Sequence, residues 1–177
     1  IDELERPREI ATVQIDIGNA KRFGISFVDE KSDRQFPTII HTAVIGSIER
    51  YLFAVLDECA MVEAKGGKPS LPLWLSPTQV RLIPVRPEFA DFSKNVINRL
   101  AESHIRADVD DRDESVDKRV RDAEVNWIPY IVVVGKKEVS TDLFSVRRRS
   151  DDKQYNSSLG DLEKEIAMHV EGYPKMT

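Results

Sequence analysis

The sequence predicts two regions of different fold class, an α+β region over residues 1–77 and an α/β domain over residues 78–177. The first region opens with the strictly alternating segment "ATVQIDI" and continues with further strand-like segments and one long helix, whereas strands and helices alternate in the second region. Strict alternation is typical of a strand in an antiparallel sheet, and alternating strands and helices are typical of α/β domains. The Gly- and Pro-rich segment "EAKGGKPSLPLWLSPTQ" marks the junction between them.

Composition limits the class of protein. Of the 177 residues, 41% are hydrophobic and 32% are charged, which allows a substantial core. No apolar run is long enough to span a bilayer, so we expect no membrane partner. Cys59 is the single cysteine, which excludes an internal disulfide and fits a reducing, cytoplasmic setting. The formal net charge of −5 argues against indiscriminate coating of nucleic acid but leaves room for a local basic site.

The first region is predicted to consist of strands followed by a helix. Val13, Ile15 and Ile17 alternate with polar residues, and residues 22–41 have the pattern of a strand, a polar turn and a second strand. From Thr42 onward apolar residues recur at helical spacing, which predicts a helix over residues 42–56. A second stripe on this helix combines small residues with an arginine, namely Ala43, Ser47, Arg50 and Ala54.

The second region is predicted to alternate between strands and helices. The expected strands are residues 79–85, 105–110 and 128–135, and the expected helices are residues 86–104, 114–126 and 158–170. Residues 138–149 have the pattern of a strand pair around a polar turn. The helical spacing predicts that the buried side chains are Phe89, Phe92, Val96 and Leu100 in one helix and Leu162, Ile166 and Met168 in the last.

Several polar residues of the first region have a structural and a functional interpretation. His41, placed at a strand end, fits a hydrogen-bonded structural histidine; as a zinc ligand it would need partners from outside this sequence. Arg50 either reaches solvent or lies in a cleft, where it would stack on a base or bind phosphate. Thr12, Gln14 and Asp16 form either a half-exposed sheet face or the floor of a pocket for a polar ligand.

Charged residues of the second region surround its most apolar strand. Asp113 ends a strand-to-helix loop, Glu138 follows the apolar strand, and Arg147 begins an arginine run after the next strand. A solvated face is the usual explanation of such charges. Alternatively, strand ends at one edge of an α/β sheet are a common ligand site, where carboxylates and guanidinium groups suit unstacked RNA bases. The sequence contains no glycine-rich phosphate loop, G-x-S-x-G or C-x-x-C motif.

Taken end to end, the chain resembles the C-terminal part of threonyl-tRNA synthetases, a family of class II aminoacyl-tRNA synthetases. The resemblance is carried, in order, by "TVQIDI", "RFGISFVDE", P-x-I-I-H-x-A-x-I-G-S-I-E-R, "LPLWLSPTQVRLIPV", "VDDRDE", "IPYIVVVGKKEV" and "SVRRR". The set is specific because His41 stands six residues before Ser47 and nine before Arg50, ahead of P-L-W-L-x-P. Bacterial members show Gln-Cys-Gly before the first strand, and its absence here suggests the archaeal type.

This resemblance implies a fold and a set of roles. Residues 1–77 would be a remnant of the antiparallel class II catalytic sheet with its motif 3 helix, and residues 78–177 an anticodon-binding domain with a mixed sheet flanked by helices. Arg50 would be the catalytic arginine that clamps ATP. Thr12, Gln14 and Ser47 would line the ATP and threonine pocket, and His41 would bind the zinc that recognises threonine.

In the second region the resemblance places Asp113, Glu138 and Arg147 at positions that contact anticodon bases of a threonine tRNA. Bacterial members carry Asn where this chain has Asp113, and an ionised Asp accepts hydrogen bonds without donating them. The implied protein is an ATP-dependent threonine–tRNA ligase and a homodimer. This chain would be an inactive fragment of it, because the first two class II motifs and the remaining zinc ligands lie outside the sequence. The alternative is a non-catalytic tRNA-binding or regulatory protein that reuses a synthetase-like anticodon-binding domain.

Overall fold

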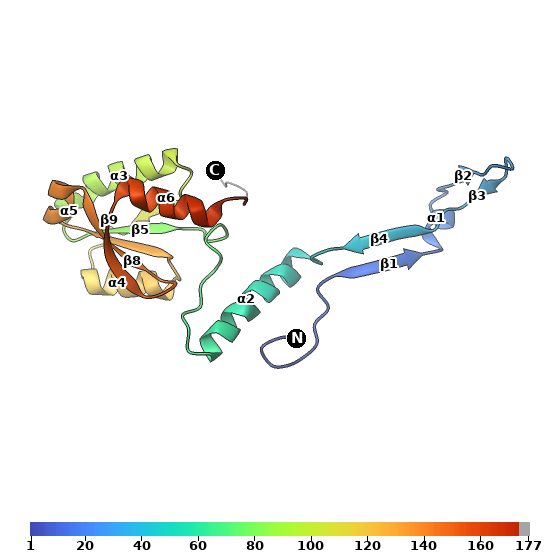
Figure 1. Cartoon of the computed structure of the whole chain (residues 1–177), viewed down its shortest axis with the longest axis horizontal. Coiled ribbons are helices and arrows are strands. Elements are labelled where there is room, and N and C mark those ends of the chain that lie inside the picture. Colours follow the sequence, from blue (N-terminus) through green and yellow to red (C-terminus); the bar gives the residue numbers. More distant parts are fainter. Residues whose placement is uncertain (174–177) are drawn as a thin grey trace. The chain divides into compact units, whose positions relative to one another are not determined.

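The computed structural model describes residues 1–173 (Figure 1). The chain divides into two compact units, one ending at Met61 and the other beginning at Val62. The change of unit falls within helix α2 (Ile48–Ala64). The domain boundary between residues 77 and 78 stays a prediction about how the chain divides by function.

The first unit is built from two small antiparallel sheets. Strands β1 (Thr12–Asp16) and β4 (Ile39–Ala43) form a two-stranded ribbon, and β2 (Phe27–Val28) and β3 (Arg34–Gln35) form a short hairpin. Helix α1 (Asn19–Arg22) lies between β1 and β2 in the sequence. The ribbon leaves its apolar face uncovered: Val13, Ile15 and Ile40 are 73%, 71% and 69% exposed. An isolated two-stranded ribbon is at best marginally stable, and an exposed apolar face of this kind is typical of a surface that packs against other protein.

The helix predicted over residues 42–56 begins later than expected. Strand β4 continues to Ala43, and α2 starts only at Ile48. Between them Gly46 has a φ of +68°, which redirects the chain, and the Ser47 hydroxyl accepts a long hydrogen bond of 3.4 Å from the Arg50 backbone N–H. The predicted stripe of small residues is therefore wrong, because Ala43 lies on a strand and Ser47 precedes the helix.

The second unit contains a mixed five-stranded sheet in the order β6-β5-β7-β8-β9. Strands β5 (Val80–Pro84), β6 (Ala107–Val109) and β7 (Tyr130–Val134) are parallel, whereas β8 (Leu143–Arg148) and β9 (Lys153–Ser158) are antiparallel to their neighbours. Its helical segments are the 3-10 turn η1 (Pro87–Phe89) and helices α3 (Ala90–Glu102), α4 (Val116–Val125), α5 (Lys136–Thr141) and α6 (Leu159–Val170). The expected mixed sheet flanked by helices is confirmed.

Helices cover the two faces of this sheet unequally. Figure 1 shows α3 and α6 on one face and α4 on the other. The larger core lies under α3 and α6 and reaches β8 through Phe144 and Val146. The smaller core lies under α4 and takes its strand residues from β5 and β7 alone, Ile83 and Ile131. On the α4 side, β8 and β9 therefore present an open face, defined here by the polar residues Ser145, Arg147, Gln154 and Asn156.

Two further expectations for the second unit are wrong. Residues 138–149 do not form a strand pair, because Glu138 caps α5 by accepting a hydrogen bond from the Gly135 N–H at 2.9 Å, and β8 pairs instead with β9. Strand β9 escaped prediction since "KQYNSS" is mostly polar. In α6, Leu162 and Ile166 are buried as expected, but Met168 is 75% exposed.

No helix in the described part of the chain has the length and apolar character needed to cross a membrane.

Candidate functional site

The polar residues expected to form a pocket floor share one face of the ribbon. In the β1–β4 register Gln14 lies opposite His41, and Thr12 lies opposite Ala43. Directly opposed residues of an antiparallel pair project from the same face, so Thr12, Gln14 and His41 are neighbours. His41 is the middle residue of β4 and not, as expected, at the strand end.

A carboxylate accompanies this histidine. The His41 Nε2 atom lies 4.0 Å from an Asp16 carboxylate oxygen. Asp16 accepts hydrogen bonds from the backbone N–H groups of Asn19 at 2.8 Å and Gly18 at 2.9 Å, and these donors lower the pKa of its carboxyl group below the usual range. Asp16 is therefore ionised near neutral pH and is placed to attract a cation or a ring N–H.

His41 fits a metal-binding role only as one contributor. Zinc in proteins takes at least three protein ligands from Cys, His, Asp or Glu. In residues 1–173 no group of three such side chains comes together. His41 offers a half-exposed imidazole, and the chain would need ligands from elsewhere to complete a metal centre.

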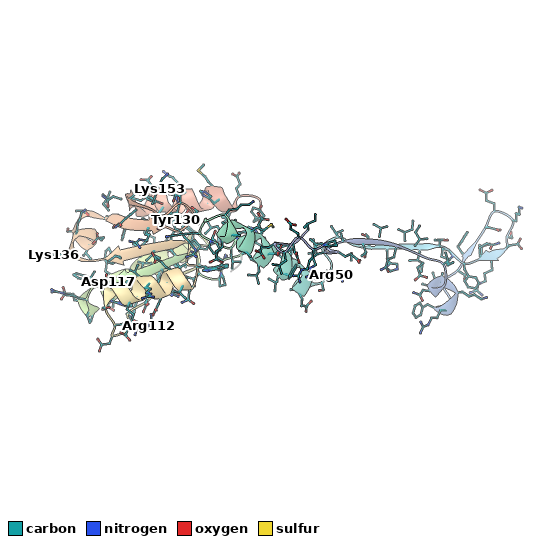
Figure 2. The ribbon with its side chains drawn as sticks, turned by 90° about the horizontal axis from the view of Figure 1, so that it is seen from below. Arg50, Arg112, Asp117, Tyr130, Lys136 and Lys153 are labelled. Carbon is teal, nitrogen blue, oxygen red and sulfur yellow. The ribbon has the colours of Figure 1, made fainter. Side chains whose placement is uncertain are left out.

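The turn before α2 holds Arg50. A Cβ atom placed on Gly46 would lie 2.8 Å from the Ile10 carbonyl oxygen and 2.9 Å from Arg50 Cδ. The aliphatic stem of Arg50 therefore passes directly over the Gly46 backbone. The Arg50 guanidinium is exposed (Figure 2) and makes no hydrogen bond or ion pair within the described residues. A side chain whose aliphatic part is packed and whose guanidinium is free is suited to binding an anion or stacking on a ring.

Asp113, Glu138 and Arg147 were expected together at one edge of the sheet in the second unit, and the first two lie there. Asp113 follows β6 and Glu138 follows β7, so both lie beyond the carboxyl ends of parallel strands, and Figure 2 shows Lys136 and Asp117 at this end. One carboxylate oxygen of Glu138 is used in capping α5. Asp113 is exposed and forms no hydrogen bond within the part of the chain that the structure describes.

Arg147 does not join them at that edge, so this expectation is wrong. It lies within β8 opposite Ile131, three residues before the end of β7, which is about 10 Å along the strand. Its side chain belongs to the open face, where its Nη1 atom contacts a Glu124 carboxylate oxygen at 2.6 Å. The structure thus separates the acceptors Asp113 and Glu138 from the donor Arg147.

The arginine run of β8 divides between the two faces of the sheet. Arg148 pairs with Asp151 and Glu165 at 2.6 and 2.7 Å. Arg149, just after the strand, donates to the carbonyl oxygens of Pro69 at 2.7 Å and Glu124 at 2.6 Å. The run is therefore a set of internal contacts, and Arg147 is its member on the open face.

Sequence reasoning missed Arg119, which supports the loop that carries Asp113. The buried Arg119 guanidinium donates to the carbonyl oxygens of Asp110 at 2.7 Å and Pro84 at 2.9 Å. It thereby ties the loop after β6 to the end of β5. The one available signal was that Arg119 falls among Val116, Val120 and Ala123, on the apolar stripe of α4.

Family models match both units. The model of the tRNA synthetase class II core domain (G, H, P, S and T) matches residues 1–59, and that of the anticodon binding domain matches residues 79–169. Together with the ribbon and the mixed sheet, these matches define part of a class II aminoacyl-tRNA synthetase with its anticodon-binding domain.

Comparison with individual proteins identifies the family more closely. The threonine–tRNA ligase of Thermofilum pendens is 55% identical over 177 residues, which are 100% of this chain and 29% of that protein. The threonine–tRNA ligase of Pyrococcus horikoshii is 48% identical over 174 residues, which are 98% of this chain and 28% of that protein. The chain belongs to the threonine–tRNA ligase family and spans less than a third of the length of these curated relatives, as the sequence resemblance predicted.

Solved structures agree with this fold. The RNA binding domain of threonyl-tRNA synthetase from Cryptosporidium parvum matches with a TM-score of 0.73 and 26% identity, covering 98% of this chain and 42% of that one. A prolyl-tRNA synthetase from the same organism matches with a TM-score of 0.75 and 20% identity, covering 97% and 35%. The second likeness concerns the fold alone.

The close approach at Gly46 predicts a difference between two glycines of the same conformation. Gly24 has a φ of +69° with nothing within 4 Å of an added Cβ among the described residues. Gly24→Ala should therefore cost about 1 kcal/mol of stability from the backbone alone, whereas Gly46→Ala should cost about 2–4 kcal/mol because it also meets the Ile10 carbonyl. Chemical denaturation of each variant of the intact protein measures both losses as changes in the free energy of unfolding. Equal losses from the two variants would contradict the close packing of Arg50 over Gly46.

Proposed function

We propose that this chain is the C-terminal part of an ATP-dependent threonine–tRNA ligase. Such an enzyme joins threonine to ATP as threonyl-adenylate with release of pyrophosphate, and then transfers the threonyl group to its tRNA. The observation that carries the proposal is the end-to-end identity of 55% with a threonine–tRNA ligase. A cytoplasmic homodimer is part of the same proposal.

Arg50 has the role of binding ATP. Its guanidinium is free in the described chain, and its stem is fixed by the close contact over Gly46. A fixed cation opposes the negative charge that develops on phosphate oxygens without having to reorient during the reaction. Ser47 fixes the start of the same helix, and Thr12 and Gln14 supply polar groups for the ATP and threonine pocket.

His41 has the role of supplying one zinc ligand. Zinc, when bound, would act as a Lewis acid that takes up the amino and hydroxyl groups of threonine. A site built for a hydroxyl group penalises valine, which leaves that position unpaired. The chain's own part is to present an imidazole from the middle of β4, with Asp16 beside it and Gln14 opposite. The other ligands belong to protein outside this chain, and we therefore propose that the chain alone does not activate threonine.

The second unit has the role of reading the anticodon of a threonine tRNA. Asp113 and the free oxygen of Glu138 accept hydrogen bonds, and Arg147 donates them to base carbonyls. The open face of β8 and β9 offers Arg147 without an apolar cover. Unstacked bases of an RNA loop fit such a polar sheet face.

Arg50→Ala in the intact protein should lower the rate of ATP–pyrophosphate exchange by on the order of 10²-fold, because one fixed cation is lost from the phosphate site. The control is Arg22→Ala, which removes another exposed arginine of the first unit. If the exchange rate of Arg50→Ala stays within about twofold of that of the unchanged protein, Arg50 does not bind ATP.

His41→Ala should reduce the preference for threonine over valine by on the order of 10²-fold or more, because the metal that recognises the hydroxyl is lost. Bound zinc, measured by atomic absorption after dialysis, should fall in parallel. His104→Ala provides the control, since His104 lies outside the first unit. Retention of both zinc and selectivity in His41→Ala would rule out the metal role.

Arg147→Ala should weaken binding of a threonine tRNA by about 1–3 kcal/mol and leave binding of a tRNA with an unrelated anticodon unchanged. Fluorescence anisotropy at fixed salt measures both affinities. Arg99→Ala is the matched control, because Arg99 lies on α3 and faces Glu163 at 3.9 Å. Equal losses of affinity for both tRNAs would mean that Arg147 contacts phosphate groups and does not recognise a base.

A further inference from the structure

We propose that Glu124 is the residue that positions Arg147 for base recognition. The inference rests on the proposed anticodon-reading function and adds a residue to it. Glu124 belongs to the last turn of α4, and its carboxylate contacts Arg147 Nη1 across the edge of the open face at 2.6 Å. Both side chains are partly accessible, 40% for Arg147 and 35% for Glu124, so the pair lies at the surface where RNA would bind.

Glu124 is itself held from the backbone side. Its carbonyl oxygen accepts hydrogen bonds from Arg149 Nη1 at 2.6 Å and from the Trp127 N–H at 3.1 Å. Arg149 also donates to the Pro69 carbonyl and lies over the Trp127 ring, 5.7 Å from its centre. These contacts fix the end of α4, so Glu124 provides a stationary anchor and not a mobile surface carboxylate.

The contact leaves most of the Arg147 guanidinium free. Within the described residues Arg147 forms one hydrogen bond, through Nη1, so its Nε and Nη2 hydrogens have no protein acceptor. A guanidinium is planar and carries five N–H donors in a fixed fork. The contact with Glu124 therefore restrains one end of the guanidinium and leaves the remaining donors available to a base.

This arrangement has two consequences for recognition. An arginine that is already ordered loses less rotamer freedom on binding than a free one, which improves affinity for the matching base. The Glu124 carboxylate also offsets the charge of Arg147 and so weakens its attraction for phosphates of any sequence. Both effects favour the matching anticodon over others.

The test uses the intact protein and two RNA hairpins that share a stem, one with the anticodon loop of a threonine tRNA and one with an unrelated anticodon. Glu124→Ala should weaken binding of the matching hairpin by about threefold to tenfold and leave the unrelated hairpin unchanged or slightly tighter. Glu124→Gln keeps an acceptor for Arg147 and should lose less than about threefold. Thermal unfolding of each variant checks that α4 remains folded, and Glu124→Ser, which also removes the carboxylate, serves if Glu124→Ala does not fold.

A double-mutant cycle decides whether Glu124 acts through Arg147. In an Arg147→Ala background, Glu124→Ala should have no further effect on the matching hairpin. The Arg99–Glu163 pair is the matched control cycle and should leave both hairpins unaffected. A loss from Glu124→Ala that is equally large without Arg147, or no loss in its presence, overturns the positioning role alone. No loss from Arg147→Ala itself overturns the anticodon role of Arg147, and the positioning role with it.

Discussion

The surface of the second unit depends on one packing contact: on one side of the five-stranded sheet a single helix, α4, packs against the strands. Helix α4 packs over β5 and β7 through Ile83, Ala123 and Ile131, and no apolar group of this core comes from β8 or β9. A five-stranded sheet is wider than one helix, so the strands beyond it stay open on that side. The apolar side of α4 does not cover β8 and β9, so the open face carries polar residues, and α4 meets it through the contact of Glu124 with Arg147.

Arginines tie both ends of α4 to neighbouring parts of the second unit. Near its start Arg119 binds two carbonyl oxygens at the ends of β5 and β6, and at its end Arg149 binds Glu124 and Pro69. Carbonyl oxygens at a helix C-terminus carry partial negative charge, so a cation there is favourable. In the described residues Arg119 Nε is buried without a protein acceptor.

Apolar periodicity made much of the second unit predictable. Strands β5 and β7 and helices α3, α4 and α6 have strong apolar patterns, and they occur where the sequence indicated. Strand β9 and the position of Arg147 were not predictable, because polar strands on an open face carry no burial signal. In the first unit, apolar spacing alone placed the helix too early, since Val44 continues the pattern but Gly46 ends any helix that would include it. Whether the residues expected to bind ATP, zinc and RNA do so stays a prediction.

The separation of Asp113 and Glu138 from Arg147 bears on how the proposed anticodon reading would work. Ionised carboxylates accept hydrogen bonds, so they suit the N–H groups of guanine, whereas a guanidinium donates and suits base carbonyls. Because the acceptors lie beyond the carboxyl ends of β6 and β7 and the donor lies within β8, a single base is poorly placed to use both sets. Different bases of the loop would then meet different chemistry. Base specificity would depend on the rigid spacing between the sheet edge and the open face, which the two arginine contacts of α4 maintain.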